Sequence, residues 1–153
     1  FFMFGVDMLE IRQDGDRILT QKAKRVANVD DAIRNICCSM IRTMHSANGV
    51  GLSGNQVGIL KRIIVFLDGQ EERVMINPEI INASLEMSTF MEGCLSFPEM
   101  YLDVRRPKTI TVKYKNTKGK PHIEQFRDFT ARVIQHEIDH LDGIVFTERS
   151  QTA

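Results

Sequence analysis

Apolar residues recur at steps of three and four positions between residues 30 and 48, the spacing that one face of an α-helix requires. This stripe consists of Ile33, Ile36, Cys37, Met40, Ile41 and Met44. Asn28 or Asp30 can cap the start of the helix, and Asn48-Gly49 can end it. We therefore expect one amphipathic helix in the N-terminal half of the chain, with Cys37 as a small buried hydrophobe.

Strand-like patterns fill the middle of the chain. "RIIVFL" (residues 62–67) is an apolar run, Asp68-Gly69 makes a turn, and "RVMIN" (73–77) is the expected hairpin partner. "IINASLEMS" alternates only weakly. "TITVKYK" (109–115) alternates cleanly, and after the turn "NTKGK" the segment "HIEQFRDF" (122–129) alternates back. These segments predict antiparallel strands.

A second helix is expected close to the C-terminus, where "VIQHEIDHLDG" covers residues 133–143. Thr130 can cap this helix and Gly143 can end it. One side carries the apolar residues that would face a core, namely Ala131, Ile134, Ile138 and Leu141. The predicted fold is α+β, with antiparallel β-sheets packed around this central C-terminal helix and one N-terminal amphipathic helix.

Composition indicates one globular domain. The chain has 153 residues, of which 42% are hydrophobic and 26% are charged, and its formal net charge is +0. We expect a single domain over residues 1–153, with residues 1–8 frayed or vector-derived, because their apolar sequence lacks the basic start of a signal peptide. The balanced charge argues against a nucleic-acid-binding surface, and no apolar run approaches the roughly 18–20 residues that span a membrane.

The chain contains three cysteines, Cys37, Cys38 and Cys94. An odd number, with two of them adjacent, does not make a disulfide framework. A reducing compartment such as the cytosol is therefore expected.

The second helix also carries residues that indicate chemistry. His136 and His140 are four positions apart and share one helix face, and Glu137 lies about 100° around from His136. This H-E-x-x-H arrangement supplies two nitrogen ligands to a metal and a carboxylate that accepts a proton from the attacking water. Phe129 and Val133 extend the histidine face, which suits a metal at the floor of an apolar pocket. The alternative is that both histidines are solvent-exposed on a charged helix.

Two histidines leave a metal site incomplete, and the residues after Gly143 offer only Glu148 as a further ligand. Cys94 in "MEGCLSFP" is the strongest upstream candidate, because it lies outside regular periodicity and follows a glycine that lets the backbone turn. One Cys and two His would leave a fourth position open, as in catalytic sites. The alternative for Cys94 is a buried apolar thiol.

The stretch "NGVGLSGNQVG" (residues 48–58) contains four glycines, a density that lets a backbone approach a ligand closely. It lacks the lysine of a phosphate-binding loop. Gln56 offers a long neutral amide that can donate to a developing oxyanion. A flexible turn between helix and strand explains the stretch equally well.

Together, "GVGLSGNQVG", "EGCLS" and "HEIDH" resemble, in order and spacing, the three motifs of peptide deformylase, and the resemblance extends over residues 11–146. It implies a cytoplasmic or organellar enzyme that hydrolyses the N-formyl group from the initiator methionine of new polypeptides and releases formate. It also implies one divalent metal ion per chain, with Fe²⁺ as the native metal and Zn²⁺, Ni²⁺ or Co²⁺ as alternatives.

The resemblance assigns roles to the matching positions. The metal ligands would be Cys94, His136 and His140, and Glu137 would be the general base and acid. The oxyanion would be held by the side-chain amide of Gln56 and the backbone N–H of Leu95. The remaining substrate contacts would be Gly51, against the substrate backbone, and the methionine-pocket residues Val50, Phe129 and Val133.

Three further residues would support the ligands. Glu92 would accept a hydrogen bond from the free ring N–H of a ligand histidine. Asp139 would pair with Arg106, which matches a recurrent arginine after the cysteine motif.

Two features depart from the family pattern. Many members have two alanines where this chain has Ser53-Gly54, and we expect the loop to close nonetheless because these residues are also small. The chain ends soon after "GIVFTERSQTA", without the C-terminal helix of many bacterial members, and we expect that helix to be dispensable for the chemistry. Short-tailed members include phage-encoded ones, so a viral source acting in a bacterial cytoplasm is one alternative.

The expected partners are N-formylmethionyl peptides of nascent chains, met in transient contact with the ribosome by a monomeric enzyme. Two other readings stay open at this stage. One is a zincin-like peptidase in which Cys94 is incidental, and the other is a metal-stabilised binding module that has lost catalysis.

Overall fold

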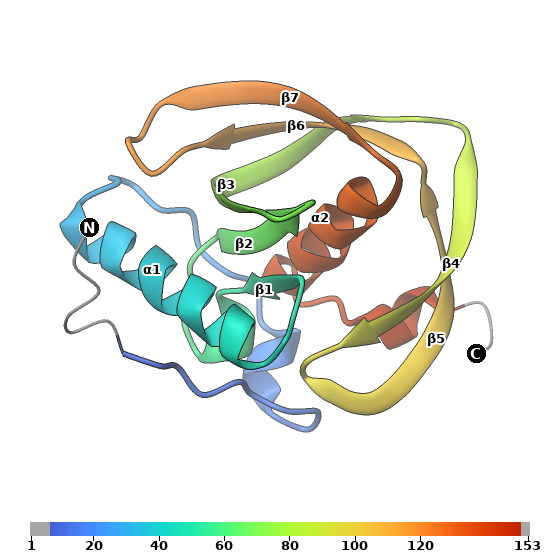
Figure 1. The fold of residues 1–153 in the computed structure, drawn as a ribbon, viewed down its shortest axis with the longest axis horizontal. Coiled ribbons are helices and arrows are strands. Elements are labelled where there is room, and N and C mark those ends of the chain that lie inside the picture. The colour runs from blue at the N-terminus through green and yellow to red at the C-terminus, as the bar shows by residue number, and fades with distance from the viewer. Residues whose placement is uncertain (1–6, 151–153) are drawn as a thin grey trace.

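The fold, seen in a computed structural model that describes residues 7–150, combines two α-helices with antiparallel strands in two sheets (Figure 1). The α+β class expected from the sequence is therefore confirmed. The expectation for residues 1–8 falls mostly outside the described range. Among the described residues, no helix combines the length and hydropathy needed to cross a membrane.

The larger sheet has five strands in the order β1-β2-β3-β6-β7, and every neighbouring pair is antiparallel. Its strands are β1 (Gly51–Ser53), β2 (Ile63–Asp68), β3 (Glu71–Ala83), β6 (Thr109–Lys115) and β7 (Pro121–Arg127). The smaller sheet is a hairpin of β4 (Met87–Cys94) and β5 (Phe97–Pro107). Short 3₁₀ helices are η1 (Arg17–Thr20), η2 (Asn55–Val57) and η3 (Phe146–Arg149).

Helix α1 (Asp31–Ser46) begins and packs as its sequence predicts. The Asp30 carboxylate caps it by accepting a hydrogen bond from the Ile33 N–H at 2.9 Å. Its stripe, including Cys37 and Met40, is buried against β1 and β2. Asn48, just beyond the helix, has a φ of 55°, so the helix ends where the Asn-Gly pair indicated.

Helix α2 (Asp128–Leu141) lies between the five-stranded sheet and the β4–β5 hairpin (Figure 1). Every residue from Ala131 to Leu141 is buried. Ile134 and Leu141 pack into the main core with Phe66 of β2 and other apolar residues of the sheet. This helix is therefore enclosed on all sides, and its polar residues must find partners within the protein.

The start of α2 differs from the prediction. Thr130 does not cap it, because the helix begins two residues earlier, at Asp128, and Arg127 occupies the cap position. The Asp128 N–H donates to the Lys108 carbonyl at 2.9 Å, which holds the chain at the point where it turns. Strand β7 consequently ends at Arg127, and Phe129, predicted at the end of that strand, lies in the helix.

The strands predicted for the middle of the chain are shorter and fewer than those in the structure. Strand β3 continues beyond Asn77 to Ala83, because two register shifts carry its pairing with β6 past Pro78. The β4–β5 hairpin was missed, since several of its apolar side chains are exposed and do not alternate cleanly. Cys94 is the last residue of β4, at a register shift next to Gly93.

Candidate metal centre

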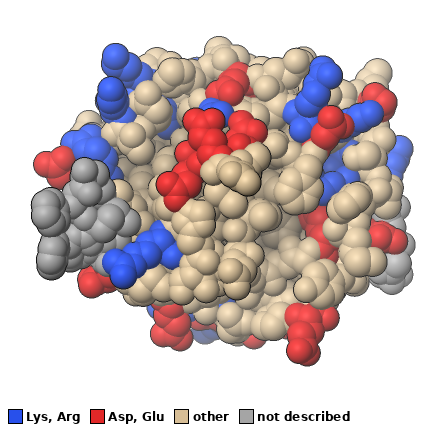
Figure 2. All heavy atoms as spheres, viewed as in Figure 1, with Lys and Arg blue, Asp and Glu red and all other residues tan. Residues whose placement is uncertain are grey.

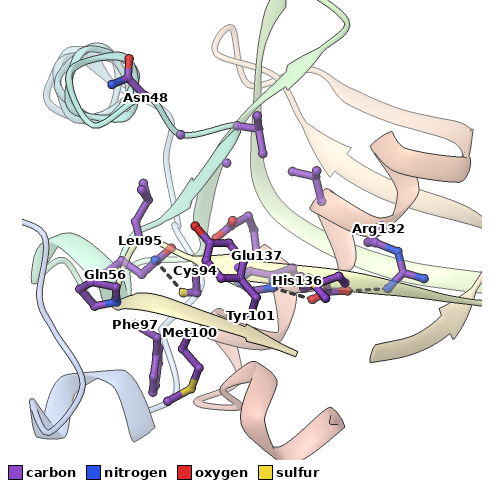
Figure 3. A pocket seen from close by; sticks show the side chains of 18 of the residues that line it. Asn48, Gln56, Cys94, Leu95, Phe97, Met100, Tyr101, Arg132, His136 and Glu137 are labelled. Atoms are coloured by element: carbon purple, nitrogen blue, oxygen red, sulfur yellow. Dashed lines mark hydrogen bonds and ion pairs between the residues drawn. The ribbon is translucent and has the colours of Figure 1, made fainter. Parts of the chain in front are cut away.

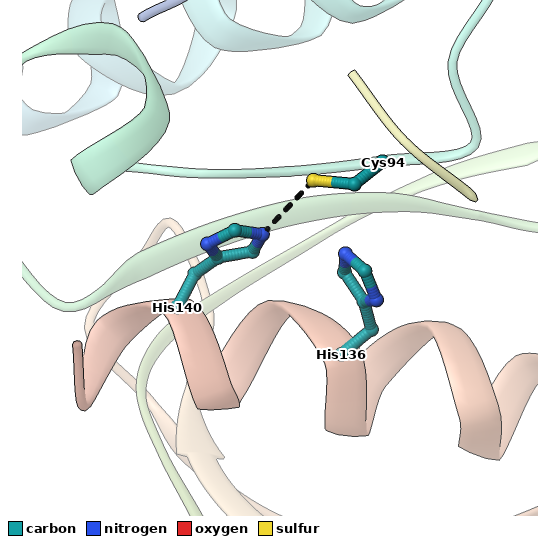
Figure 4. A group of neighbouring side chains, drawn as sticks. All are labelled: Cys94, His136 and His140. Atoms are coloured by element: carbon teal, nitrogen blue, oxygen red, sulfur yellow. Dashed lines mark hydrogen bonds between the residues drawn. The ribbon is translucent and has the colours of Figure 1, made fainter. Parts of the chain in front are cut away.

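Three side chains bring potential ligand atoms together at the surface of α2. Cys94 approaches from the end of β4, and His136 and His140 project from successive turns of α2 (Figure 4). Their ligand atoms lie within 4.8 Å of one another, and the Cys94 Sγ is 3.3 Å from the His140 Nε2. The segments that carry them are far apart in sequence, so the fold creates this cluster.

The chemistry of these donors fits a divalent cation. Burial, and to a smaller extent His136 and Arg106, lower the pKa of His140 well below its ordinary value, which favours the neutral ring that binds metals. Burial would also lower the pKa of His136, but hydrogen bonds to Cys94 and Glu92 outweigh it and raise that pKa to about 10. The same negative surroundings favour a bound cation. One thiolate and two imidazoles are a ligand set that Zn²⁺ and Fe²⁺ both accept.

Glu137 lies beside this cluster with a carboxylate suited to proton transfer. Burial raises its pKa from 4.5 to about 7, close to neutral pH. Its Oε1 is buried and has no hydrogen-bond partner among the described residues. Gly51 packs against it so closely that a Cβ at this glycine would lie 2.7 Å from the Glu137 Oε2. A larger residue at position 51 would therefore displace the carboxylate.

A buried ion-pair network lies behind His136. The Nδ1 of this ring is 2.9 Å from the Glu92 Oε1. Arg106 contacts both oxygens of Glu92, at 2.6 and 3.0 Å, and Arg132 contacts Oε2 at 2.6 Å. Burial would raise the pKa of Glu92, but the hydrogen bonds to His136 and Arg106 lower it to about 2. Glu92 therefore stays a carboxylate and fixes the orientation of the His136 ring.

Arg106 extends the network to Asp139, three residues further along α2. Its Nη1 donates to the Asp139 Oδ2 at 2.8 Å, which is the pairing expected from the sequence. Arg149 of η3 also donates to both oxygens of Asp139, at 3.0 and 3.1 Å. A contact from this C-terminal segment was not expected.

Gln56 is held in one orientation by the glycine-rich stretch. Its Oε1 accepts hydrogen bonds from the backbone N–H and the hydroxyl of Ser53, at 3.0 and 3.2 Å. Its Nε2 therefore faces the Cys94, His136 and His140 cluster, 3.6 Å from the Cys94 Sγ and 3.1 Å from the Ser96 Oγ. Residues 51–57 of the stretch are buried and include β1 and η2, so the stretch is more than a turn between helix and strand.

A cavity of about 430 Å³ opens beside the cluster (Figure 3). The face drawn in Figure 2 is hollowed in the middle, where uncharged residues predominate, and most acidic and basic side chains lie around it. The walls of the cavity contain all the residues expected to touch substrate, namely Val50, Gly51, Gln56, Leu95, Phe129 and Val133. Val133 is buried, whereas Val50 and Phe129 are partly exposed at the rim.

Several lining residues were not expected from the sequence. Met91, Met100 and Tyr101 of the missed hairpin form part of the rim, and Arg132 lies deeper. Ser96, which accepts a hydrogen bond from Gln56, is buried behind the cavity wall. A charged residue inside the apolar run "ARVI" was the one available signal for Arg132, since a buried arginine needs a buried partner. Ser96 gave no such signal, because its contact with Gln56 depends on two loops that meet only in the fold.

Comparison with protein families gives one match over almost the whole chain. The family model described as polypeptide deformylase matches residues 8–153. A curated peptide deformylase of Synechocystis sp. is 48% identical over 147 residues, which cover 92% of this chain and 78% of that protein.

Solved structures of similar proteins have the same fold. The crystal structure of peptide deformylase from Thermotoga maritima is 41% identical, with a TM-score of 0.93, and the alignment covers 95% of this chain and 99% of that one. A class I type b peptide deformylase from Acinetobacter baumannii, bound to Met-Ala-Ser, is 35% identical with a TM-score of 0.90. That alignment covers 94% of this chain and 99% of the other.

Proposed function

The chain belongs to the peptide deformylase family, and we propose how its own residues carry out the reaction of that family. The protein is a metal-dependent hydrolase that removes the N-formyl group from the N-terminal formylmethionine of newly made polypeptides and releases formate. The readings as a zincin-like peptidase or as an inactive binding module are thereby set aside. The catalytic unit is proposed to be one domain that extends over the matched residues.

Cys94, His136 and His140 are the proposed metal ligands. The convergence of their ligand atoms within 4.8 Å is the observation that carries this assignment. A divalent ion held there would act as a Lewis acid that could polarise the formyl carbonyl and lower the pKa of water. We propose Fe²⁺ as the native ion, as the resemblance to the family implies. Zn²⁺ or Ni²⁺ are proposed as substitutes, because a mixed thiolate and imidazole set accepts all three ions.

Glu137 is the proposed general base and general acid. It takes a proton from the attacking water and later gives it to the nitrogen of the leaving amine. A pKa of about 7 supports both steps, since the carboxyl group is then neither strongly acidic nor permanently protonated near neutral pH. Its unpartnered Oε1 leaves an acceptor site for that proton.

Gln56 and Leu95 are the proposed stabilisers of the negative charge that develops on the formyl oxygen. The hydrogen bonds from Ser53 support this role, because they direct the amide N–H of Gln56 towards Cys94 and away from the glycine-rich stretch. A donor fixed before the reaction loses little free energy in reorientation. The backbone N–H of Leu95, next to the ligand Cys94, is the second proposed donor.

The methionine side chain of the substrate is proposed to occupy the apolar part of the cavity between Val50, Phe129 and Val133. Gly51 is proposed to contact the substrate backbone, since it lacks a side chain that would fill the space beside Glu137. Glu92, Asp139 and Arg106 are proposed to hold His136 and α2 in place through their buried ion pairs.

Formate release from formyl-Met-Ala-Ser tests these assignments. The parent protein should release formate, and Glu137→Ala should lose almost all activity while it retains its metal. Cys94→Ala should lose metal, so a fully active Cys94→Ala protein would contradict the ligand assignment. Metal analysis on anaerobically purified protein identifies the ion, and predominant iron is the expected result.

We further propose a cytoplasmic monomer that meets nascent chains in transient contact with the ribosome and binds no nucleic acid directly. The near-neutral charge of the chain supports the absence of a polyanion surface. Light scattering after size exclusion should give the mass of a single chain. Co-sedimentation with ribosomes that carry formylated nascent chains, compared with empty ribosomes, tests the transient contact.

A further inference from the structure

The three proposed ligands belong to two parts of the fold that share no main-chain sheet pairing. Cys94 ends β4, and the β4–β5 hairpin forms a sheet separate from the five-stranded one. His136 and His140 lie on α2, which packs on the larger sheet. A metal site of fixed geometry therefore needs side-chain contacts that hold the hairpin against the helix.

Arg132 provides the most extensive set of such contacts. It precedes His136 by one helical turn, and only 6% of its surface is exposed. Its Nη1 donates to the Glu92 Oε2 at 2.6 Å and to the Val104 carbonyl at 2.8 Å. Its Nη2 donates to the carbonyl and the hydroxyl of Ser88, at 2.8 and 3.0 Å. One guanidinium on α2 thus binds both strands of the hairpin.

The hairpin presents a matching surface to this guanidinium. Ser88, Phe90 and Glu92 alternate along β4 and share one face, and Val104 pairs with Phe90 across the hairpin. The Phe90 ring lies over the Arg132 guanidinium, with the Cζ 5.9 Å from the ring centroid. Arg132 is therefore enclosed between the helix, two strands and an aromatic ring.

The contact with Glu92 extends to a ligand. The Glu92 Oε2 binds Arg132 and Arg106, and its Oε1 binds Arg106 and His136. Two hydrogen bonds on each oxygen fix the plane of the carboxylate. Without Arg132, Oε2 would keep only Arg106, and the carboxylate could rotate away from the His136 ring.

We propose that Arg132 is a positioning residue that holds the strand bearing Cys94 against the helix bearing His136 and His140, and thereby sets the affinity of this centre for a divalent metal. The inference rests on the ligand set proposed above. Arg132 itself contacts neither metal nor substrate in this proposal. The planar guanidinium of Arg132 donates hydrogen bonds to several acceptors at once, whereas the compact ammonium group of a lysine could not reach all of them.

Metal affinity separates this role from a general contribution to stability. The parent, Arg132→Gln and Arg132→Lys proteins would be loaded with Co²⁺, and its dissociation constant measured by competition with a chelator. The absorption bands of Co²⁺, including the thiolate-to-metal band, report whether Cys94 remains bound. We expect Arg132→Gln to bind Co²⁺ about 10- to 100-fold more weakly with a reduced thiolate band, and Arg132→Lys to lie between it and the parent.

Arg73→Gln is the matched control. Arg73 is also largely buried and forms ion pairs with Asp68 and Glu124, but it does not line the cavity. Its variant should lose stability while keeping the parental Co²⁺ affinity and spectrum. If Arg132→Gln does not fold, Arg132→Lys decides the question, because it keeps a positive charge beside Glu92.

Parental Co²⁺ affinity and spectrum in a folded Arg132 variant would overturn the inference, as would an equal loss of affinity in Arg73→Gln. The proposed ligand set fails in a different way. In that case the parent itself would bind Co²⁺ without a thiolate band, or Cys94→Ala would bind it as tightly as the parent does.

Discussion

The Glu92 Oε1 lies 2.9 Å from the His136 Nδ1, while both oxygens of the same carboxylate bind buried arginines. A carboxylate in this position fixes the ring so that its Nε2 faces Cys94. It also makes the imidazole a stronger electron donor to a metal. The orientation of one proposed ligand is therefore determined by a residue outside the proposed ligand set.

Glu92→Gln should weaken both the metal centre and the fold. The amide removes the negative charge from between two buried guanidiniums, and breaking a buried ion pair from one side costs about 3–5 kcal/mol. We expect a lower melting temperature and metal affinity reduced by about 10- to 100-fold. Thermal unfolding and chelator competition measure the two effects.

Glu124→Gln is the control for that variant. Glu124 binds Arg73 at 2.7 Å, but its side chain is 40% exposed, so the pair is screened by solvent. Its replacement should cost no more than about 1 kcal/mol and leave metal affinity unchanged. Equal effects of the two glutamine variants on metal affinity would show that Glu92 has no special relation to His136.

Alanine substitutions at Ser53 and at Gly54 should lower the stability of the protein by different amounts. Ser53→Ala removes one of two hydrogen bonds to the Gln56 Oε1, and the backbone N–H retains the other. A loss of about 1 kcal/mol and only a small decrease in kcat are expected. At Gly54, a new Cβ would lie 2.5 Å from two backbone carbonyl oxygens, those of Ile59 and Lys61.

Gly54→Ala should therefore destabilise the protein more than Ser53→Ala, by about 1–3 kcal/mol, because backbone atoms must shift. Urea unfolding of the two single variants gives the comparison directly. A Gly54→Ala protein as stable as the parent would mean that this turn adapts as freely as its small residues first indicated. The two positions would then be interchangeable.

The sequence predicted those parts of the molecule whose signals are local. The stripe and cap of α1 are visible within twenty residues, and the spacing of His136 and His140 fixes their common face whatever surrounds them. The candidate set around Cys94 followed from the number of ligands that a metal needs. Its residues are brought together in the fold, although their roles remain predictions.

What the sequence could not predict depends on contacts between distant segments. The β4–β5 hairpin lies at the surface with Phe90 and Tyr101 exposed, so its alternation is weak. Arg132 was not singled out from the sequence, because its acceptors lie 28 to 44 residues away along the chain. The start of α2 was misplaced, since a tertiary hydrogen bond to Lys108 determines where the chain turns.

Ionisation of Cys37 should make the free energy of unfolding depend on pH in the alkaline range. Burial, with a smaller contribution from Cys38, raises the pKa of its thiol from 9.0 to about 12 in the folded chain. As the pH rises, this thiol therefore ionises in the unfolded chain before it ionises in the folded one. Its contribution to the free energy of unfolding is complete below about pH 9 and is lost as the pH rises towards about 12. Between these two pH values, the free energy of unfolding should decrease with a slope that approaches about 1.4 kcal/mol per pH unit because of this thiol.

Urea unfolding of Cys37→Ala between pH 8 and 11 isolates this slope. The variant should be less stable than the parent at pH 8, and the difference should narrow as the pH rises. Cys38→Ala should retain most of the parental slope, because Cys38 is only partly buried. A difference between parent and Cys37→Ala that stays constant with pH would show that the thiol titrates normally in the folded protein.

Phe146 should support the metal centre from beyond the last sequence motif. It is 1% exposed, and its ring lies 5.7 Å from the His136 ring and 5.5 Å from Phe97. Phe146→Ala should lower the free energy of unfolding by about 3–5 kcal/mol, because a large cavity would open beside the proposed ligand His136. Metal affinity should fall as well, since the ring of His136 would lose the contact that restricts its tilt.

Two comparisons make that prediction specific. Ile123→Ala, at a position that is 65% exposed on β7, should change stability by no more than about 0.5 kcal/mol. Arg149→Gln should cost about 1 kcal/mol or less, because Asp139 keeps its buried bond to Arg106. If Phe146→Ala loses stability but binds metal as the parent does, η3 only covers the core. A parallel loss of metal affinity would show that this C-terminal segment also helps to build the site.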